Sequence, residues 1–430
     1  MRILRTLPAL AAVASVGLLV TACGSSLDSN SSSSSASGGT ATLKIGFVSP
    51  ETGPLAGFGE ADTFVVDQMK QYFASHPIKA GNTTYNVEIV VKDAQSDSKR
   101  AGEVAAELIN TDNVDIVLAE GTPDITNPVA DQCEANATPC VTTVAPWQPY
   151  FLGRGGTKEK PFKWTYHFFW GLEDVAAVYQ DMWNQVPTNK KVGGLFPNDA
   201  DGQAWEKAFP DMIKANGYTL NDPGLYPDGT TDFTSQISKF KASDDQVLTG
   251  VPIPPDFTTF WKQAHQQGYT PKIATIGKAL LFPSSVEALG DIANNLGTEV
   301  WWTPTYPYKS SLTGQSAQEL ADAYSSSTGK QWTQPLGFAE SLFEVAAAAV
   351  SAAGSSDKAK VADALKTLKV DTVVGNLDWS SGPVPNVAKT PVTGGQWRKV
   401  PGSKYPFDLV IVSNSLAPNI PPRGKVEPRG

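Results

Sequence analysis

The sequence predicts an α/β protein made of two doubly wound lobes, and three observations lead to this prediction. The chain has 430 residues, of which 41% are apolar, so it is too long for one compact lobe and too apolar to be disordered throughout. From Thr42 onward, short apolar strands alternate with amphipathic helices, a pattern typical of a mainly parallel sheet covered on both faces. The same alternation restarts after a Gly- and Lys-rich stretch at 153–160.

The first 41 residues predict export and attachment to a membrane. Arg2 and Arg5 precede an apolar run, 7–20, which is shorter than the roughly 20 residues of a permanent membrane helix. Val20-Thr21-Ala22-Cys23 resembles a bacterial lipobox, so we expect a signal peptide over 1–22 and acylation of Cys23. The alternative is an ordinary secretory signal. The Ser- and Gly-rich residues 23–41 would then form a linker that holds a globular domain at the extracytoplasmic face of the membrane.

The first half of the globular part contains four predicted strands and three predicted helices. Strands are expected where apolar residues alternate or form a short run, at 43–47, 87–91, 114–119 and 140–143. Helices are expected where apolar residues recur along one face, at 64–73, 101–109 and 126–136. Asp97 can cap the second of these helices.

The second half repeats the pattern. Strands are predicted at 191–196 and 246–249, and helices at 174–186, 203–216 and 257–267. Trp205, Phe209 and Trp261 lie on these helices at positions expected to pack inward. No repeat of short fixed period exists, which excludes solenoids and propellers.

The three cysteines agree with an exported protein. With Cys23 used by lipid, Cys133 and Cys140 remain, near the end of one predicted helix and the start of the next strand. In an oxidising compartment we expect them to form a disulfide, the alternative being two buried thiols. Their spacing is not CxxC, which argues against a redox-active pair.

Composition excludes several classes of function. The 34 Lys and Arg face 43 Asp and Glu, a formal charge of −9, which disfavours a nucleic-acid partner. Only three His and three Cys occur, without HExxH or CxxC, so we expect no metal and no cofactor. A nucleophile elbow, a P-loop and a dinucleotide fingerprint are all missing, so we expect no enzyme. A secreted hydrolase stays open, because Asp and Glu are plentiful.

Five motifs occur in a fixed order along the chain: Ile45-Gly46 with Thr52 to Leu55 and Phe58-Gly59; VKDAQSD at 91–97; TDF at 231–233; QAHQQG at 263–268; and VGNLDW at 374–379. Behind a lipobox, this set resembles the branched-chain amino acid type (type I) substrate-binding proteins of ABC transporters. The similarity extends from about Thr42 to Val412.

The resemblance implies a type I periplasmic-binding fold of the Venus-flytrap kind, with three crossovers near Phe168, Thr303 and Gly375. Its domain bounds would be 42–168 plus 304–374 for the first lobe, 169–303 plus 375–416 for the second, and 417–430 for a C-terminal tail. It also implies a monomer that binds a small molecule and works with permease and ATPase subunits.

In such a fold the carboxyl ends of the parallel strands form a crevice where helix N-termini offer N–H groups to a carboxylate. In the first lobe, Phe58 stands where relatives often carry an aromatic lid residue, or it belongs to the core. The Thr122 hydroxyl and neighbouring N–H groups can hold an anion, although Pro123 lacks an N–H. Trp147, with Gln148 beside it, is either an aromatic wall or an anchor of a surface loop.

The second lobe contributes further candidates. Asp201 either caps the next helix or reaches the ligand, and Ile253 lies in a segment that replaces an aromatic-rich stretch of relatives. Lys278 falls where relatives that bind α-amino acids tend to have an acidic residue, and a cation there would attract a carboxylate unless it faces solvent. Trp170 and Phe338 complete the candidate aromatic walls.

Together these residues predict an extracytoplasmic solute-binding lipoprotein that captures a small, aromatic or largely apolar carboxylate and delivers it to an ABC importer. The alternatives are a binder of amino acids or amides for import, and an envelope receptor that senses a ligand.

Overall fold

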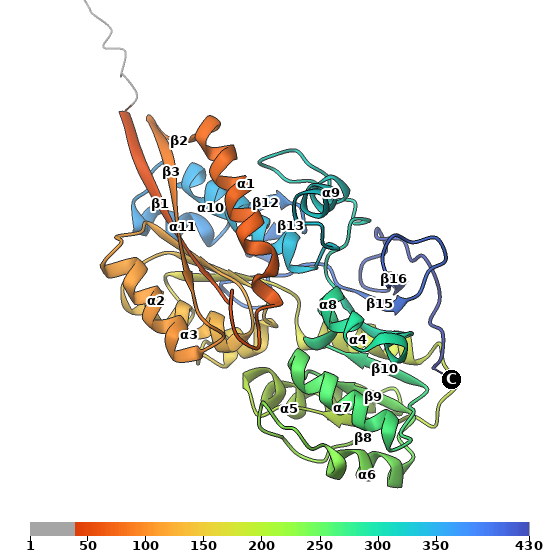
Figure 1. Cartoon of the computed structure of the whole chain (residues 1–430). Helices are drawn as coiled ribbons and strands as arrows, with labels where there is room; N and C mark the ends of the chain where they lie inside the picture. The colour runs from red at the N-terminus through yellow and green to blue at the C-terminus, as the bar shows by residue number, and fades with distance from the viewer. Residues whose placement is uncertain (1–38, 430) are drawn as a thin grey trace, which may run out of the picture. The chain divides into compact units, whose positions relative to one another are not determined.

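Two seven-stranded sheets organise the chain (Figure 1). The computed structural model describes residues 39–429. The predicted signal peptide, the lipidation site Cys23 and nearly all of the linker therefore lie outside the described residues.

The first sheet has the strand order β14-β6-β5-β4-β1-β3-β2, and every neighbouring pair is parallel except β2 with β3. Its strands are β1 (Gly39–Ser49), β2 (Ile78–Ala80), β3 (Thr83–Asp93), β4 (Ile116–Ala119), β5 (Cys140–Thr143), β6 (Thr165–Phe168) and β14 (Val387–Ala388). Its early helices are α1 (Asp62–Ser75), α2 (Ser98–Asn110) and α3 (Pro123–Ala135). The predicted strands and helices of this half are confirmed, with shifts of a few residues at their ends.

Helix α2 shows how local sequence sets these elements. The Asp97 carboxylate accepts a hydrogen bond from the N–H of Arg100 at 2.7 Å, which caps the helix as predicted. The apolar stripe that predicted the helix is buried against β1, β3 and α3: Ala101, Val104, Ala105, Leu108 and Ile109.

The second sheet has the order β16-β15-β11-β10-β9-β7-β8. Its parallel strands are β7 (Lys191–Leu195), β8 (Thr219–Asn221), β9 (Val247–Gly250), β10 (Ile273–Ile276) and β11 (Leu296–Val300), and β15 (Thr393–Arg398) and β16 (Asp408–Ser413) add an antiparallel edge. The helices of this lobe are α4 (Leu172–Trp183), α5 (Ala200–Lys214), α6 (Thr234–Ser243), α7 (Pro254–Gln266) and α8 (Pro283–Glu287). The restart of the α/β pattern is thus confirmed.

The chain passes between the sheets three times. It leaves the first sheet after β6 and returns after β11 to build α9 (Ala317–Thr328), α10 (Pro335–Ala353), α11 (Lys358–Leu365), β12 (Lys369–Thr372) and β13 (Gly375–Asp378). Because β14 still pairs with β6, the last passage lies between Ala388 and Thr393, and not near Gly375 as the resemblance implied.

Helix α10 is the central helix of the first lobe. It is long and apolar enough to cross a membrane by length and composition, but 78% of its most apolar window is buried inside the fold. It packs on β2, β4 and β5 and beside α1, so it is a core helix of the lobe.

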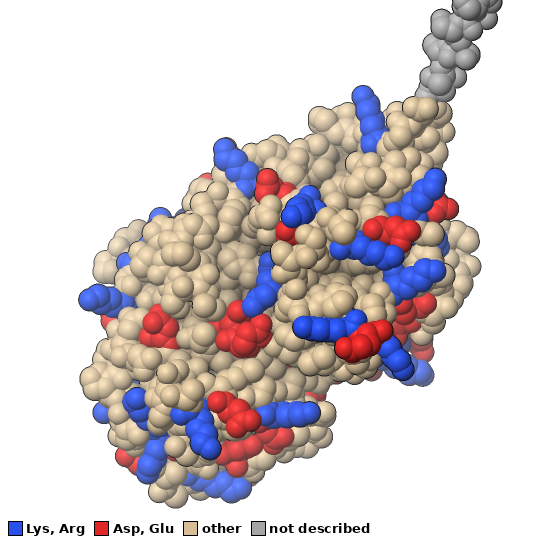
Figure 2. Space-filling model, turned by 180° about the vertical axis from the view of Figure 1, so that it is seen from behind, with Lys and Arg blue, Asp and Glu red and all other residues tan. Residues whose placement is uncertain are grey.

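The residues predicted to form a C-terminal tail pack on the second lobe. The N–H of Arg429 donates to the Lys272 carbonyl at 2.8 Å, and the Arg429 guanidinium lies 4.7 Å from the centre of the Trp261 ring. On the face shown in Figure 2, acidic and basic side chains are interspersed over the surface.

Candidate ligand-binding site

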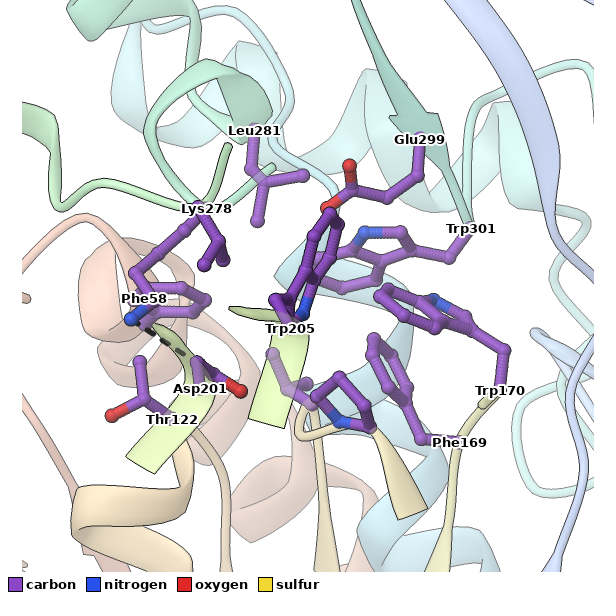
Figure 3. A pocket seen from close by; sticks show the side chains of 13 residues that line it. Phe58, Thr122, Phe169, Trp170, Asp201, Trp205, Lys278, Leu281, Glu299 and Trp301 are labelled. Carbon is purple, nitrogen blue, oxygen red and sulfur yellow. Dashed lines mark ion pairs between the residues drawn. The ribbon is translucent and has the colours of Figure 1, made fainter. Parts of the chain in front are cut away.

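A small cavity lies where the carboxyl ends of strands from both sheets meet. Thr122 follows β4, Phe169 follows β6, Lys278 follows β10, and Trp301 follows β11, as expected for an α/β crevice. The cavity has a volume of about 20 Å³, room for about one water molecule. Its lining residues, drawn in Figure 3, are Phe58, Thr122, Val144, Pro146, Phe169, Trp170, Asp201, Trp205, Val251, Lys278, Leu281, Glu299 and Trp301.

Aromatic rings form most of the wall. The Phe169 ring lies 4.6 Å from that of Trp170 and meets the Trp301 ring edge to face at 5.2 Å, measured between centroids. Phe338 does not line the cavity. It packs behind these rings, edge to face with Trp301 at 4.9 Å, so it supports the wall from a second layer.

Four hydrogen-bond donors in the wall have no partner among residues 39–429. They are the Thr122 hydroxyl and the indole N–H groups of Trp170, Trp205 and Trp301, and all four atoms are buried. Buried polar groups are nearly always hydrogen-bonded, and leaving one unpaired costs about 1 to 3 kcal/mol. A cavity that collects several such donors is therefore suited to a ligand with acceptor atoms.

Lys278 belongs to the cavity but is not a free cation. Its side chain is 3% exposed, and its Nζ lies 2.5 Å from Asp199 Oδ2 and 3.2 Å from Asp201 Oδ2. The alternative of a solvent-facing lysine is therefore wrong. The expectation that its charge would be open to a ligand carboxylate also needs correction, because two carboxylates already neutralise it.

The two aspartates beside Lys278 have different tasks. Asp199 caps α5 by accepting a hydrogen bond from the N–H of Gly202 at 2.7 Å. Asp201 instead faces the cavity, and its Oδ1 has no partner among the described residues. Burial raises the pKa of Asp201 to about 7; Lys278 opposes this rise, whereas Asp199 and Asp124 add to it.

Glu299 is a cavity residue that the sequence analysis missed. It lies on β11, is 2% exposed, and accepts hydrogen bonds at Oε2 from the hydroxyls of Tyr179 and Thr298, the latter at 3.3 Å. Burial raises the pKa of Glu299 to about 7, although these hydrogen bonds and those from backbone N–H groups, including that of Lys278, act in the opposite direction. The signal in the sequence is a lone acidic residue inside the apolar run 296–302, which begins with strand β11.

Trp205 packs inward from α5 as predicted and also lines the cavity. The residue was expected to pack inward from its helix, and its ring does stack on Phe209 at 4.5 Å between centroids. Its other edge lines the cavity, and Figure 3 shows it between Thr122 and Glu299. The inward face of α5 at this point therefore borders the cavity between the lobes.

Trp147 and Gln148 do not line the cavity; they lie at the first crossover. The Trp147 indole N–H donates to Glu173 Oε1 at 3.1 Å, and Gln148 Oε1 accepts from the N–H of Leu172 at 2.9 Å. Lys389, on the third crossover, donates to the same Glu173 oxygen at 2.9 Å. These side chains therefore tie a loop of the first lobe to helix α4 of the second, so Trp147 is not an aromatic wall of the cavity.

Ile253 is the residue that precedes α7 and is 5% exposed. The cavity is lined two positions earlier, by Val251, so Ile253 is a packing residue.

Cys133 and Cys140 are free thiols, so the predicted disulfide is wrong and the alternative of two buried thiols holds. Both side chains are completely buried. Burial and contact with Cys140 raise the pKa of Cys133 well above its usual value, which disfavours the thiolate that disulfide formation needs.

The chain is similar to known solute-binding proteins. The model of a family described as periplasmic binding protein matches residues 42–399. The Leu/Ile/Val-binding protein homolog 3 of Brucella melitensis is 26% identical over 353 residues, which cover 80% of this chain and 89% of that protein.

Two solved structures show the same fold. A leucine-binding protein from Thermotoga maritima has a TM-score of 0.72 at 20% identity, over 87% of this chain and 99% of that chain. A solute-binding protein of an ABC transporter from Rhodopseudomonas palustris, in complex with p-hydroxybenzoic acid, has a TM-score of 0.69 at 17% identity, over 90% and 98%.

The order of the strands, the three passages between the sheets and the match over 42–399 agree with one another. Members of this family are solute-binding proteins that work outside the cytoplasm. The chain therefore belongs to the periplasmic binding protein family and has the type I fold of these solute-binding proteins.

Proposed function

We propose that the protein captures a small, flat and largely apolar carboxylate between its lobes and delivers it to the permease and ATPase subunits of an ABC importer. One observation carries the proposal: five aromatic rings surround a cavity in which four buried donors have no partner within the described part of the chain. Rings offer a flat slot, and unpaired donors favour a ligand with carboxylate oxygens.

In this proposal the unpaired donors of the cavity wall bind the carboxylate of the ligand, because Lys278 is already paired with Asp199 and Asp201. Thr122 comes from the first lobe and Trp205 from the second, so one carboxylate bound between them would hold the lobes together. A ligand favours the closed form only through contacts that it makes in that form, and these donors supply such contacts.

Entry of the ligand requires movement. The cavity of about 20 Å³ is far smaller than the roughly 300 Å³ at which ligand pockets usually begin. The aromatic rings that line the cavity belong to both lobes. Opening of the lobes therefore moves the two sets of rings apart and lets a solute enter. Closure then removes water from the bound solute.

Relatives of this fold include proteins solved with aromatic acids and with an amino acid. Two other solute-binding proteins from Rhodopseudomonas palustris were solved with 3,4-dihydroxybenzoic acid and with 4-hydroxybenzoate, at 17% identity to this chain. A relative from Streptococcus pneumoniae was solved with isoleucine, also at 17% identity.

An amino acid or amide is the second candidate, and one observation favours it. Asp199, Asp201 and Glu299 outnumber Lys278 around the cavity, and such an excess of carboxyl groups favours an ammonium group. The raised pKa values of Asp201 and Glu299 weaken this argument, because near neutral pH both groups are partly uncharged.

Isothermal titration calorimetry on the purified protein separates the candidates. We expect benzoate and 4-hydroxybenzoate to bind one molecule per chain and leucine and isoleucine to give no heat of binding. Thr122→Val should weaken both aromatic acids by a similar factor of about five to ten, the value of one lost hydrogen bond. Binding of leucine but of neither aromatic acid would transfer the assignment to the amino-acid candidate.

We also propose that Cys23 carries the lipid anchor and that the protein acts as a monomer at the outer face of the cell membrane. A Cys23→Ala variant should leave the membrane fraction and appear in the soluble fraction. An envelope receptor is distinguished by uptake: deletion of a transporter subunit would abolish import of the labelled acid, whereas deletion of a receptor would leave it unchanged.

A further inference from the structure

We infer that Glu299 selects solutes that carry a hydroxyl group on the ring, at the end away from the acid group. This inference rests on the proposed function and adds a specificity residue to it. Figure 3 shows Glu299 and Thr122 on opposite sides of the cavity, with Trp205 between them. An aromatic acid anchored at Thr122 would therefore direct its far edge toward Glu299.

Glu299 is a buried acidic group that pairs with no cation of the described residues. It is 2% exposed, and among residues 39–429 no Lys, Arg or His forms an ion pair with it. Lys278, which lines the same cavity, is engaged by Asp199 and Asp201. A buried carboxyl group is costly to maintain unless its oxygens are hydrogen-bonded, so a cavity-lining one without a counter-ion is a candidate for ligand recognition.

The partners of Glu299 leave one side of the carboxyl group for a ligand. The hydroxyls of Tyr179 and Thr298 both donate to Oε2. Tyr179 is completely buried on α4, so it fixes the orientation of the carboxyl group from behind. The backbone N–H of Lys278 also acts on the carboxyl group, whereas no side chain of the described residues donates to Oε1. A carboxylate oxygen accepts more than one hydrogen bond, so Oε1 can still accept one from a ligand.

A neighbouring indole favours a hydroxyl over an ammonium. The N–H group of Trp301, which the proposed anchor of the acid group does not use, has no partner in the described chain, and its ring lines the cavity with Glu299. An N–H edge carries positive charge and repels a cation. A hydroxyl group satisfies both requirements, because its hydrogen can be donated to Glu299 while its oxygen accepts from an indole N–H.

Three matched acids test this inference by calorimetry at pH 7: 4-hydroxybenzoate, 4-methylbenzoate of similar size, and 4-(aminomethyl)benzoate with an ammonium group. We expect the wild-type protein to bind the hydroxy acid at least about tenfold more tightly than the methyl acid, because the apolar analogue leaves buried groups unpaired. The ammonium analogue should bind more weakly than the hydroxy acid.

Two variants attribute the preference to Glu299. Glu299→Gln should lower the ratio of the affinities for the hydroxy and methyl acids to below about threefold, while the affinity for the methyl acid stays within about threefold of wild type. Tyr179→Phe, which removes the orienting hydroxyl, should lower the same ratio partially. Thr122→Val is the matched control: it should weaken both acids and leave their ratio unchanged.

The outcomes separate the two claims. If the wild-type protein binds none of the three acids, the proposed function fails, and this inference fails with it. If it binds the hydroxy and methyl acids equally, or prefers the ammonium analogue, the inference is overturned while capture of an aromatic acid stands. Should Glu299→Gln not fold, the wild-type ratio and the Tyr179→Phe variant still decide.

Discussion

Phe58 of the first lobe and Phe282 of the second meet edge to face, with ring centroids 4.9 Å apart. Phe58 lines the cavity, and Phe282 is completely buried. The contact joins the loop after β1 to the segment between β10 and β11, so it forms only when the lobes are closed. Gly57 lies against the same ring: a Cβ atom added there would be 2.9 Å from Phe282.

A side chain at position 57 should therefore hinder closure. Gly57 has φ −57° and ψ −32°, which other residues adopt without strain, so the effect of Gly57→Val is confined to the clash with Phe282. Overpacking of this kind costs about 1 to 3 kcal/mol. We expect ligand affinity to fall by about tenfold or more in calorimetry.

The stability of the open protein supplies the control. Denaturant unfolding without ligand should change by less than about 1 kcal/mol, because separated lobes relieve the clash. Gly102→Ala on α2, where the nearest atom would be 3.6 Å from the added Cβ, should leave ligand affinity unchanged. Equal affinities for the wild type and Gly57→Val would contradict the closed contact.

Removal of the Lys278 cation should destabilise the fold. Lys278→Met leaves Asp199 and Asp201 close together and buried without their counter-ion, and breaking a buried ion pair costs about 3 to 5 kcal/mol. Urea unfolding measures this loss. The double variant Lys278→Met with Asp199→Asn should recover part of it, because Asn also caps a helix. A single variant as stable as the wild type would show that the pair is solvated.

Two tryptophans near the first crossover, Trp147 and Trp170, should differ in the effect of substitution by phenylalanine on ligand affinity and on stability. Trp170→Phe removes an unpaired indole N–H from the cavity wall and should weaken binding of an aromatic acid by about fivefold to tenfold. Trp147→Phe removes the hydrogen bond to Glu173 and should cost about 1 kcal/mol of stability with affinity within about twofold. Calorimetry measures the ligand affinity of both variants, and urea unfolding measures their stability. Loss of affinity in Trp147→Phe but not in Trp170→Phe would place Trp147 at the ligand.

The elements with strong periodicity could be predicted from the sequence. Asp97 and the stripe behind it identify α2, and alternation identifies β3. Strand β6 could not be predicted, because Thr165 to Phe168 contain polar residues that are usually exposed. His167 is buried there only because Thr142 and the Ala145 carbonyl, more than 20 residues away, satisfy its ring nitrogens.

The residues of the candidate site could be predicted in part, because local motifs locate the strand ends but do not reveal distant partners. Motif order locates the ends of the strands, and Phe58, Thr122, Trp170, Asp201 and Lys278 all line one cavity. The partners of these residues are not encoded locally: Asp199, which neutralises Lys278, is 79 positions away. A difference of two positions also changes the outcome, as Val251 lines the cavity and Ile253 does not.

The cysteines give a prediction that depends only on burial. Cys133 and Cys140 are completely buried free thiols, so native protein should not react with an aromatic disulfide reagent. After denaturation, a form that begins at Gly39 should release two equivalents of chromophore per chain. A value of zero in denaturant would reveal a disulfide between them.

Stability should fall as the pH rises from about 5 to 8, and Asp62 gives the clearest test. Asp62 is completely buried beside Glu120, and the Ser49 hydroxyl donates to its Oδ2 at 2.5 Å. Burial raises the pKa of Asp62 from 3.8 to about 7 against the effect of Ser49, and it raises the pKa of Glu120 as well.

The sign follows from proton binding. Between about pH 4 and 7 the folded protein keeps a proton on Asp62 that the unfolded chain has released, so the free energy of unfolding decreases as the pH rises through this range. Asp201, Glu299 and Glu344, whose pKa values are also raised to about 7, act in the same direction. Each unit of pKa corresponds to about 1.4 kcal/mol.

Asp62→Asn should therefore flatten the pH profile. Asn keeps an acceptor for Ser49 and cannot ionise, so the decrease in unfolding free energy between pH 5 and 8 should shrink by at least about 1.4 kcal/mol in urea titrations. Asp97→Asn, an exposed residue whose replacement still caps α2, should keep the wild-type profile. A wild-type profile that rises toward pH 8 would mean that Asp62 is ionised inside the fold, with a cation or water at its free oxygen.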